Sequence, residues 1–245
     1  MGQQSNGHYH PLTIAQRDIA RIFSGMGFDI AEGPEAESEY YNFDALNIPA
    51  DHPARDLWDT FWLKEATEDR ALLRTHTSPV QIRYMETHKP PIRIIAPGKV
   101  YRYEATDATH EAQFYQLEGL VVDETTNLGT LKGVLARFFK EFFGKEADVR
   151  LRPSYFPFVE PAVEVDMSCF LCEGKGCNVC KKTGWIEIMG AGMVHPKVLL
   201  NVGIDPRKYQ GFAFGAGIDR LLMLKHGITD VRLLYTGDLR LVNQF

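Results

Sequence analysis

Four cysteines lie close together in the second half of the chain, and their spacing is typical of a metal-binding knuckle. They form two Cys-x-x-Cys pairs, Cys169 with Cys172 and Cys177 with Cys180. Four thiolates at this spacing suit tetrahedral zinc in a closed, structural site. Iron–sulfur ligation and free thiols are the alternatives. We predict a zinc-knuckle insert over residues 167–184 that ties down a hairpin and takes no part in the chemistry.

Two neighbouring segments carry a second set of candidate residues, and their alternation predicts β-strands. Side chains two positions apart on a strand share one face of the sheet. The candidates on such faces are Arg102 and Glu104 in the first segment and Phe114, Gln116 and Glu118 in the second. The loop between the segments contains His110 and is longer than a tight hairpin needs, which favours a loop that covers a ligand. A solvated outer face of the sheet is the alternative.

A glycine-rich segment, residues 211–221, resembles a dinucleotide fingerprint, but Arg220 replaces its third glycine and a Rossmann site is disfavoured. Ala213 and Gly215 share one strand face and leave space above the sheet for a ligand, while the phenylalanines between them pack below. Arg220, in the first turn of the next helix, adds positive charge beside amide groups that favour anions. A packing strand followed by a surface arginine is the alternative. The chain has no G-x-x-x-x-G-K-[ST] motif, so arginines on a sheet would have to hold any ATP phosphates.

Predicted helices and strands position these residues. Apolar residues recur at steps of three and four over residues 11–26 and 128–142, and a glycine follows each helix. A third helix is predicted over Ile218–His226. Period-two alternation predicts strands over residues 92–96, 100–103, 114–122, 149–152, 162–167, 185–189 and 211–214. Because several connections are too short for crossover helices, we predict an α+β domain with an antiparallel sheet flanked by helices.

Composition places the chain among ordinary folded proteins. It has 245 residues, 44% apolar and 24% charged, with a formal net charge of −5. We predict a disordered tail over residues 1–9 and one domain over residues 10–245. The sequence shows neither a membrane span nor a signal peptide, so we expect a cytoplasmic protein. An acidic net charge is not typical of nucleic-acid-binding domains, so an RNA partner would be bound by a local group of residues or by another chain.

Taken together, these residues resemble the class II aminoacyl-tRNA synthetases. The second motif of that class is an R-x-E strand, a loop and a returning strand, and the third is a Gly-rich strand that ends in Glu-Arg. Here Asp219 stands in place of the glutamate, and Gly33-Pro34 matches the proline of the first motif. The resemblance narrows to the alpha subunits of phenylalanyl-tRNA synthetase and covers His10 to Phe245. The segments that carry the narrower match are residues 41–47, 52–55, 73–78, 152–158 and 192–196.

The resemblance implies a two-step reaction in which phenylalanine is activated with ATP and Mg²⁺ and then transferred to tRNA(Phe). Positioned cations are the main need of the first step, because negative charge accumulates on the phosphoryl oxygens. The resemblance assigns the α-phosphate to Arg102, the far phosphates to Arg220 and the adenine to Glu104 and Phe114. It places His110 near the phosphates. It assigns Mg²⁺ to Glu160, at a position shared with a beta subunit.

The resemblance also implies a phenylalanine pocket. Its aromatic walls are Phe156 and Phe158, with Val159, Ala213 and Gly215 lining the remainder. Positions that hold the ammonium and carboxylate groups are Trp62, His76, Ser78, Gln116 and Glu118. Ser78 has an alternative role, because Ser78-Pro79-Val80-Gln81 also predicts a helix N-cap with a capping glutamine. An apolar pocket rejects an added hydroxyl by only about a hundredfold, so proofreading by the beta subunit is expected.

The implied assembly is an α₂β₂ heterotetramer. Full-length family members carry an N-terminal coiled coil that grips tRNA, so the present chain is expected to be either truncated or a minimal form, and transfer to tRNA to depend on the partner. Two other functions are weighed against this one. A paralogue would adenylate or bind an amino acid without charging tRNA(Phe). A non-enzymatic, zinc-dependent RNA-binding or scaffold module is disfavoured by Arg102, Glu104 and Arg220.

Overall fold

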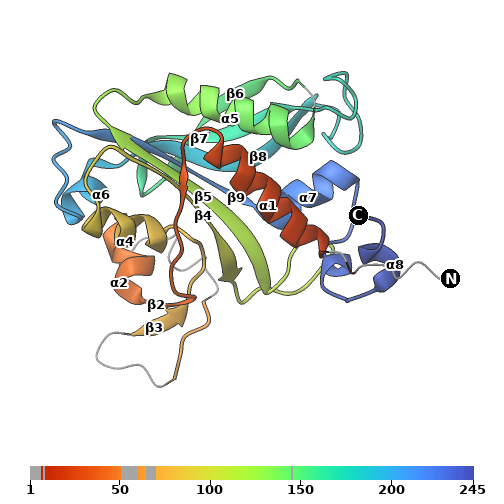
Figure 1. Ribbon diagram of the computed structural model, residues 1–245, viewed down its shortest axis with the longest axis horizontal. Coiled ribbons are helices and arrows are strands. Elements are labelled where there is room, and N and C mark those ends of the chain that lie inside the picture. Colours follow the sequence, from red (N-terminus) through yellow and green to blue (C-terminus); the bar gives the residue numbers. More distant parts are fainter. Residues whose placement is uncertain (1–6, 8, 51–59, 65–69, 145) are drawn as a thin grey trace.

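The centre of the molecule is a single large sheet. In the computed structural model, which describes residue 7 and residues 9–50, 60–64, 70–144 and 146–245, seven strands join in the order β1-β4-β5-β9-β8-β7-β6 (Figure 1). Their bounds are β1 Asp29–Ile30, β4 Ile92–Tyr101, β5 Gln113–Asp123, β6 Val149–Phe156, β7 Val159–Ser168, β8 Trp185–Val194 and β9 Gln210–Gly217. Each neighbouring pair is antiparallel except β1 with β4. The predicted α+β class with a largely antiparallel sheet is confirmed.

Helices cover both faces of this sheet. One face packs against α1 (Pro11–Ser24), α5 (Leu128–Phe143) and α7 (Ile218–His226), with η2 (Val231–Leu234) beside them. The other packs against α2 (Glu39–Asn42), η1 (Asp44–Leu46), α4 (Pro79–Thr87) and α6 (Pro196–Asn201). Figure 1 shows α1 and α5 on one side and α2 and α4 on the other, with the small sheet of β2 (Ala36–Ser38) and β3 (Ala71–Leu73) below and α8 (Leu239–Val242) near the C-terminus. No helix in the described part of the chain is long and apolar enough to cross a bilayer.

Aromatic side chains dominate the core between the sheet and α1. Phe23 of α1 lies between Phe138 of α5 and Phe214 of β9, with ring centroids 4.9 and 5.6 Å apart. All three side chains are fully buried. The Phe214 ring lies over Gly119 of β5, where a Cβ would come within 2.1 Å of the ring. Glycine at 119 therefore lets α1 and the Gly-rich strand pack closely.

Local signals explain where the long helices begin and end. Asn127 caps α5 by accepting the backbone N–H of Gly129 (2.8 Å) and Thr130 (3.1 Å), and the Thr130 hydroxyl accepts from the Asn127 N–H. Gly144 ends the helix with a φ of 68°, which suits glycine. The three predicted helices are confirmed, and the glycine expected to stop α1, Gly27, follows a short turn after Ser24.

Arg74 ties together segments on the other side of the sheet. Its Nη1 donates to the carbonyl oxygens of Gly33 (3.0 Å) and Pro34 (3.2 Å), and its Nε donates to that of Lys99 (2.8 Å). A Cβ at Gly98 would lie 2.2 Å from a guanidinium nitrogen. Gly98 thus makes room for Arg74 across the end of β4.

Two sequence predictions about β4 were wrong. The strands expected at 92–96 and 100–103 form one strand, Ile92–Tyr101, which pairs with β5 along its whole length. It passes through Pro97 because β1 pairs only with Ile94 and Ile95, so β4 is an edge strand beyond that point among the described residues, and edges tolerate proline. Arg102 and Glu104 were expected on the strand but lie just after it.

Two predicted segments lie outside the described residues. The tail predicted over residues 1–9 lies mostly outside them, and residues 52–55, part of the family resemblance, lie entirely outside them.

Candidate active site

Two cavities meet at Arg102. The first has a volume of about 400 Å³ and the second about 740 Å³. Among the described residues, Arg102 is the one that lines both. We call them the small cavity and the large cavity.

The small cavity has an apolar end made by aromatic and aliphatic side chains. The residues that form it are Leu46, Phe156, Phe158, Val159, Val194, Val198 and Ala213. The rings of Phe156 and Phe158 stack on each other, with centroids 5.9 Å apart and planes at 15°. A Cβ at Gly190 would lie 2.9 Å from the Phe156 ring, so the glycine lets this ring lie against β8. The walls leave an apolar slot that suits an aromatic side chain.

The polar end of the small cavity is organised around Glu118. Its carboxylate accepts hydrogen bonds from Ser78 Oγ (2.8 Å), from Gln116 Nε2 (2.9 Å) and from Gln81 Nε2. These donors favour the charged form, but burial outweighs them and raises the pKa of Glu118 to about 7. Gly215 lies against this group, since a Cβ there would come within 2.8 Å of Glu118 Oε1. A buried carboxylate at the mouth of an apolar slot suits an ammonium group.

The prediction that α4 begins with Ser78 at the N-cap and Pro79 in the first turn is confirmed, but the side-chain capping hydrogen bond is not formed. Ser78 precedes α4 with a helical backbone (φ −57°, ψ −29°), and its side chain makes no cap hydrogen bond. Both side chains donate to Glu118 instead. Of the two roles considered for the Ser78 side chain, the one on the wall of the small cavity is the one that the geometry supports.

His76 is a buried residue of the same cavity wall. Its Nε2 lies 3.1 Å from the carbonyl oxygen of Asn42, which can only accept, so Nε2 carries the proton. Burial and the positive charge of Arg102 lower the pKa of His76 to about 3. His76 is therefore neutral near pH 7 and lines the cavity as a polar but uncharged group.

Arg102 is held from behind by the backbone. Its Nε donates to the carbonyl oxygen of Thr75 (3.1 Å), and its guanidinium carbon lies 5.1 Å from the centre of the Phe114 ring. Burial lowers its pKa from the usual value, and the negative charges of Glu104 and Glu118 oppose this shift. An arginine remains protonated under any such shift near neutrality. A fixed cation thus stands where the two cavities join.

The large cavity collects the other residues predicted for a nucleotide. Arg102, Glu104, His110, Phe114 and Arg220 all line it. The loop that carries His110 is ordered by Asp107, whose carboxylate accepts the backbone N–H groups of Thr109 and His110. Hydrogen bonds from Thr109 lower the pKa of Asp107.

Asp219 and Arg220, adjacent in the sequence, have different surroundings. Asp219 is buried and accepts the backbone N–H of Tyr115 (2.8 Å) and the hydroxyl of Tyr235. Burial raises its pKa. Arg220 is exposed, and one of its terminal nitrogens donates to the carbonyl oxygen of Glu187 (3.2 Å). Asp219 therefore anchors the start of α7, and Arg220 projects its charge to the large cavity.

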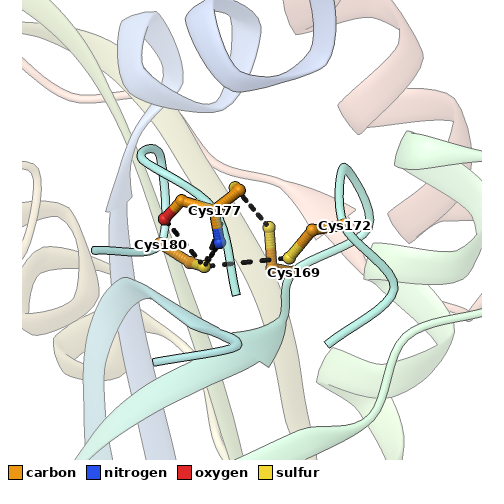
Figure 2. Close-up of side chains that lie close together, drawn as sticks. All are labelled: Cys169, Cys172, Cys177 and Cys180. Atoms are coloured by element: carbon orange, nitrogen blue, oxygen red, sulfur yellow. Dashed lines mark hydrogen bonds between the residues drawn. The ribbon is translucent and has the colours of Figure 1, made fainter. Parts of the chain in front are cut away.

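The four cysteines converge between β7 and β8. Figure 2 shows the pair Cys169 and Cys172 facing the pair Cys177 and Cys180. Neighbouring sulfur atoms lie 3.7 to 3.8 Å apart, and all four lie within 4.8 Å of one another. A tetrahedron with metal–sulfur bonds of about 2.3 Å has edges of about 3.8 Å. The backbone N–H groups of Gly176 and Cys177 point at two of the sulfurs, at 3.2 and 3.0 Å, as donors to thiolates do. The donor set therefore fits a tetrahedral metal ion.

Comparison with known proteins agrees with this geometry. The family described as "tRNA synthetases class II core domain (F)" matches residues 1–245. A phenylalanine–tRNA ligase alpha subunit from Caldanaerobacter subterraneus subsp. tengcongensis is 62% identical over 239 residues, which are 98% of this chain and 69% of that protein. The Bacillus subtilis and Moorella thermoacetica proteins of the same name are 56% and 58% identical, and the alignments cover 98% of this chain and 69% and 70% of those proteins. This chain belongs to the phenylalanine–tRNA ligase alpha subunit family.

Comparison with solved structures supports the same fold at a lower sequence identity. The crystal structure of a pyrrolysyl-tRNA synthetase from Desulfitobacterium hafniense superposes with a TM-score of 0.71 and 21% identity, covering 96% of this chain and 76% of that one. At this identity the likeness concerns the fold. The family model and this superposition both give this phenylalanine–tRNA ligase family member a class II synthetase fold.

Two residues predicted for ligands lie outside both cavities of this family member. The backbone of Trp62 forms an isolated antiparallel β-bridge with Leu72. Its ring lies under the guanidinium of Arg70, whose central carbon is 3.9 Å from the ring centre. The Glu160 carboxylate is exposed, and Nε2 of His195 lies 3.2 Å from it. Neither lines the small or the large cavity. Their roles remain predictions that this geometry does not support.

Sequence reasoning missed other residues on the cavity walls. Gln81 was taken for a capping residue, although its position three residues after Ser78 could also have placed it one helical turn along the same wall. Leu171, Asn178 and Val179 of the cysteine insert line the large cavity, and the sequence offered no signal for this.

Metal bound by the insert should stabilise this family member. We expect about one zinc per chain in reduced, anaerobically purified protein, and a lower midpoint of thermal unfolding after chelation, because a closed metal site links the two loops only in the folded state. Metal analysis and calorimetry with and without a chelator measure both. Cys172→Ser, at a half-exposed ligand, should lose the metal and the chelator effect. Unchanged thermal unfolding in metal-free protein would contradict a structural role.

Proposed function

We propose that this chain activates L-phenylalanine with ATP to form phenylalanyl-adenylate and transfers the amino acid to tRNA(Phe). The observation that carries the proposal is the position of Arg102, which lines a cavity suited to an aromatic amino acid and a second cavity suited to a nucleotide. In the activation step the amino-acid carboxylate and the α-phosphate must meet. A shared cation at the junction is placed to bind both.

The proposed mechanism depends mainly on orientation and charge. One carboxylate oxygen of phenylalanine attacks the α-phosphorus of ATP, the bond from phosphorus to the bridging oxygen breaks, and pyrophosphate leaves with that electron pair. Arg102 stabilises the negative charge on the α-phosphoryl oxygens, and Arg220 that on the leaving pyrophosphate. Phe114, also on the wall of the large cavity, stacks on the adenine base.

Substrate recognition in this proposal uses both ends of the small cavity. Glu118 binds the ammonium group, with Ser78, Gln81 and Gln116 fixing the orientation of the carboxylate. The ring enters between the apolar walls, where Ala213 leaves space and Phe156 and Phe158 close the sides. Side chains at that end offer a tyrosine hydroxyl no obvious partner, yet discrimination of this kind is typically about a hundredfold, so a separate proofreading site is expected.

Partners and ions complete the proposal. The alpha-subunit name of the relatives supports a beta subunit as partner. An α₂β₂ assembly and proofreading by the beta subunit are part of the proposal because the sequence resemblance implies them. The chain is proposed to use Mg²⁺ with ATP, which would neutralise phosphate charge; no step is assigned to Glu160, because it lies outside the large cavity. Zinc is the proposed metal of the four cysteines, because the sulfur spacing matches it.

Amino-acid-dependent ATP–pyrophosphate exchange tests the proposal directly. A panel of amino acids is assayed with and without a candidate beta subunit, followed by charging of tRNA(Phe). Phenylalanine alone should support rapid exchange, with charging in the presence of the partner. Absence of phenylalanine-dependent exchange under both conditions would refute the proposal, and exchange without charging in the complete assembly would favour the adenylating paralogue.

The pKa of Glu118 predicts a pH dependence of phenylalanine binding. In the empty site the carboxyl has its pKa raised to about 7, whereas binding an ammonium group needs the carboxylate. The KM for phenylalanine should therefore fall about tenfold per pH unit as pH rises toward 7 and level off above it. Exchange kinetics from pH 5.5 to 8.5 at saturating ATP measure this. Glu118→Gln should bind weakly at every pH, and a persisting slope in that variant would assign it to another group.

The raised pKa of Glu118 also makes stability depend on pH, and in the opposite direction from phenylalanine binding. Between the ordinary value of 4.5 and about 7, folded protein holds a proton on Glu118 that the unfolded chain has released. This group's contribution to the free energy of unfolding therefore decreases as pH rises through that range. His76, with a pKa of about 3, is neutral in the folded protein across this range but protonated in the unfolded chain below its ordinary value of 6.5, so its own contribution increases as pH rises toward 6.5.

A further inference from the structure

The cysteine insert supplies part of the wall of the large cavity. Leu171 lies between the two cysteines of the first pair, and Asn178 and Val179 lie between those of the second. Both Cys-x-x-Cys loops therefore reach the cavity that Arg102 and Arg220 also line. The fold that brings the sulfurs together also brings these wall residues together.

The base of the insert is fixed, and its cavity side is open. Cys169 and Cys180 are buried in the main core, and Phe170 stacks on Phe143 of α5 with centroids 5.0 Å apart. Leu171 and Val179, in contrast, are each 51% exposed although they are apolar. Two half-exposed apolar side chains on the rim of a cavity offer a surface for the apolar part of a ligand.

The lining of the large cavity contains both kinds of side chain that a nucleotide needs, cationic and apolar. Its polar side chains include the cations Arg102 and Arg220, which suit phosphates, together with His110 and the acidic Glu104, Glu111 and Asp219. Its apolar side chains are Phe114, Leu171, Val179, Met223, Leu224, Ile228 and Val231. A purine base with its ribose needs such an apolar surface, and the triphosphate needs the cations.

We propose that Leu171 and Val179 contact the base and ribose of bound ATP, so that the cysteine insert positions the nucleotide. This inference rests on the proposed function, because it takes the large cavity to be the ATP site. Metal at the four cysteines would hold the two loops, and with them both side chains, against the nucleotide. The insert then acts on ATP affinity while no residue of it enters the chemical step.

A double variant, Leu171→Ser with Val179→Ser, tests the contact in exchange assays with the beta subunit present. The KM for ATP should rise about tenfold, as expected when two small apolar contacts are lost. The KM values for phenylalanine and for pyrophosphate should not change, because neither ligand reaches the base region. Lys175→Ser is the matched control, since Lys175 belongs to the same insert but lies outside the cavity. Metal content and thermal unfolding are measured on every variant.

Each outcome bears on a distinct claim. An unchanged KM for ATP in the double variant with full metal content would overturn the inference. If that variant loses metal, Leu171→Ala and Val179→Ala alone take its place. Cys172→Ser should lose the metal and raise the KM for ATP as the double variant does, and a normal KM in its metal-free form would overturn the role of the metal. Failure of the unaltered protein to exchange would instead refute the proposed function, and calorimetric titration of ATP into the same variants would still test the contact.

Discussion

Replacing Arg102 with glutamine is expected to lower kcat/KM for phenylalanine-dependent exchange by about 10²- to 10³-fold, the usual effect of removing one preorganised donor from a developing anion. Arg102 lines both cavities and is oriented by its hydrogen bond to the Thr75 carbonyl. Both substrates lose a partner in this variant, so kcat should fall and both KM values should rise. Steady-state exchange at varied ATP and varied phenylalanine separates these effects.

Arg137→Gln is the matched control for this variant. Arg137 lies on the exposed side of α5 and pairs with Glu141 four residues on, far from either cavity lining. Its loss should leave exchange unchanged, because exposed pairs of this kind contribute little. Thermal unfolding shows whether Arg102→Gln remains folded. Less than a tenfold loss in a folded protein would remove Arg102 from the centre of the mechanism.

Replacing Gly215 with alanine should raise the KM for phenylalanine by about 10- to 100-fold, equivalent to weakening a charged hydrogen bond. The new Cβ would lie 2.8 Å from Glu118 Oε1 and 3.2 Å from Gln116 Nε2, so the carboxylate must move. The KM for ATP should change little, because Gly215 does not line the large cavity. Exchange kinetics at varied phenylalanine measure the effect.

Gly133→Ala is the corresponding control. The position is inside α5, and apart from the adjoining residues and the backbone of the helix itself no described atom lies within 4 Å of the added Cβ. An alanine in a helix interior should raise the free energy of unfolding by up to about 1 kcal/mol, with kinetics unchanged. Equal kinetic effects of the two substitutions would show that the Gly215 result reflects glycine replacement in general.

The fold was largely predictable because its signals are local. The helices at 11–24, 128–143 and 218–226 have apolar stripes and terminal glycines, and the strands alternate with short turns. β4 was divided in error because Pro97-Gly98 is typical of a turn. Its continuity depends on β5 pairing beside it and on Arg74 filling the space above Gly98, and both are long-range.

The positions named for the candidate site came from the family resemblance, and the roles of these residues remain predictions. Arg102, Glu118, Phe156 and Ala213 lie on cavity walls as that resemblance implies. The role of Ser78 illustrates the limit of local patterns. Ser-Pro-x-Gln favours a cap whether or not a carboxylate lies nearby, and Glu118 is 40 residues further along the chain. Residues of the cysteine insert were missed for the same reason, since only the folded chain brings them to the wall of the large cavity.

The hydrogen bonds of Arg74 have a consequence for how the molecule opens. The residue joins the Gly33-Pro34 carbonyls to that of Lys99, and the adjoining Thr75 carbonyl holds Arg102. Three segments distant in the sequence thus share one set of contacts beside the two cavities that Arg102 lines. Local opening of any one breaks the bonds of the others, so these segments should unfold and refold as one cooperative unit, and their amide protons should exchange with solvent together.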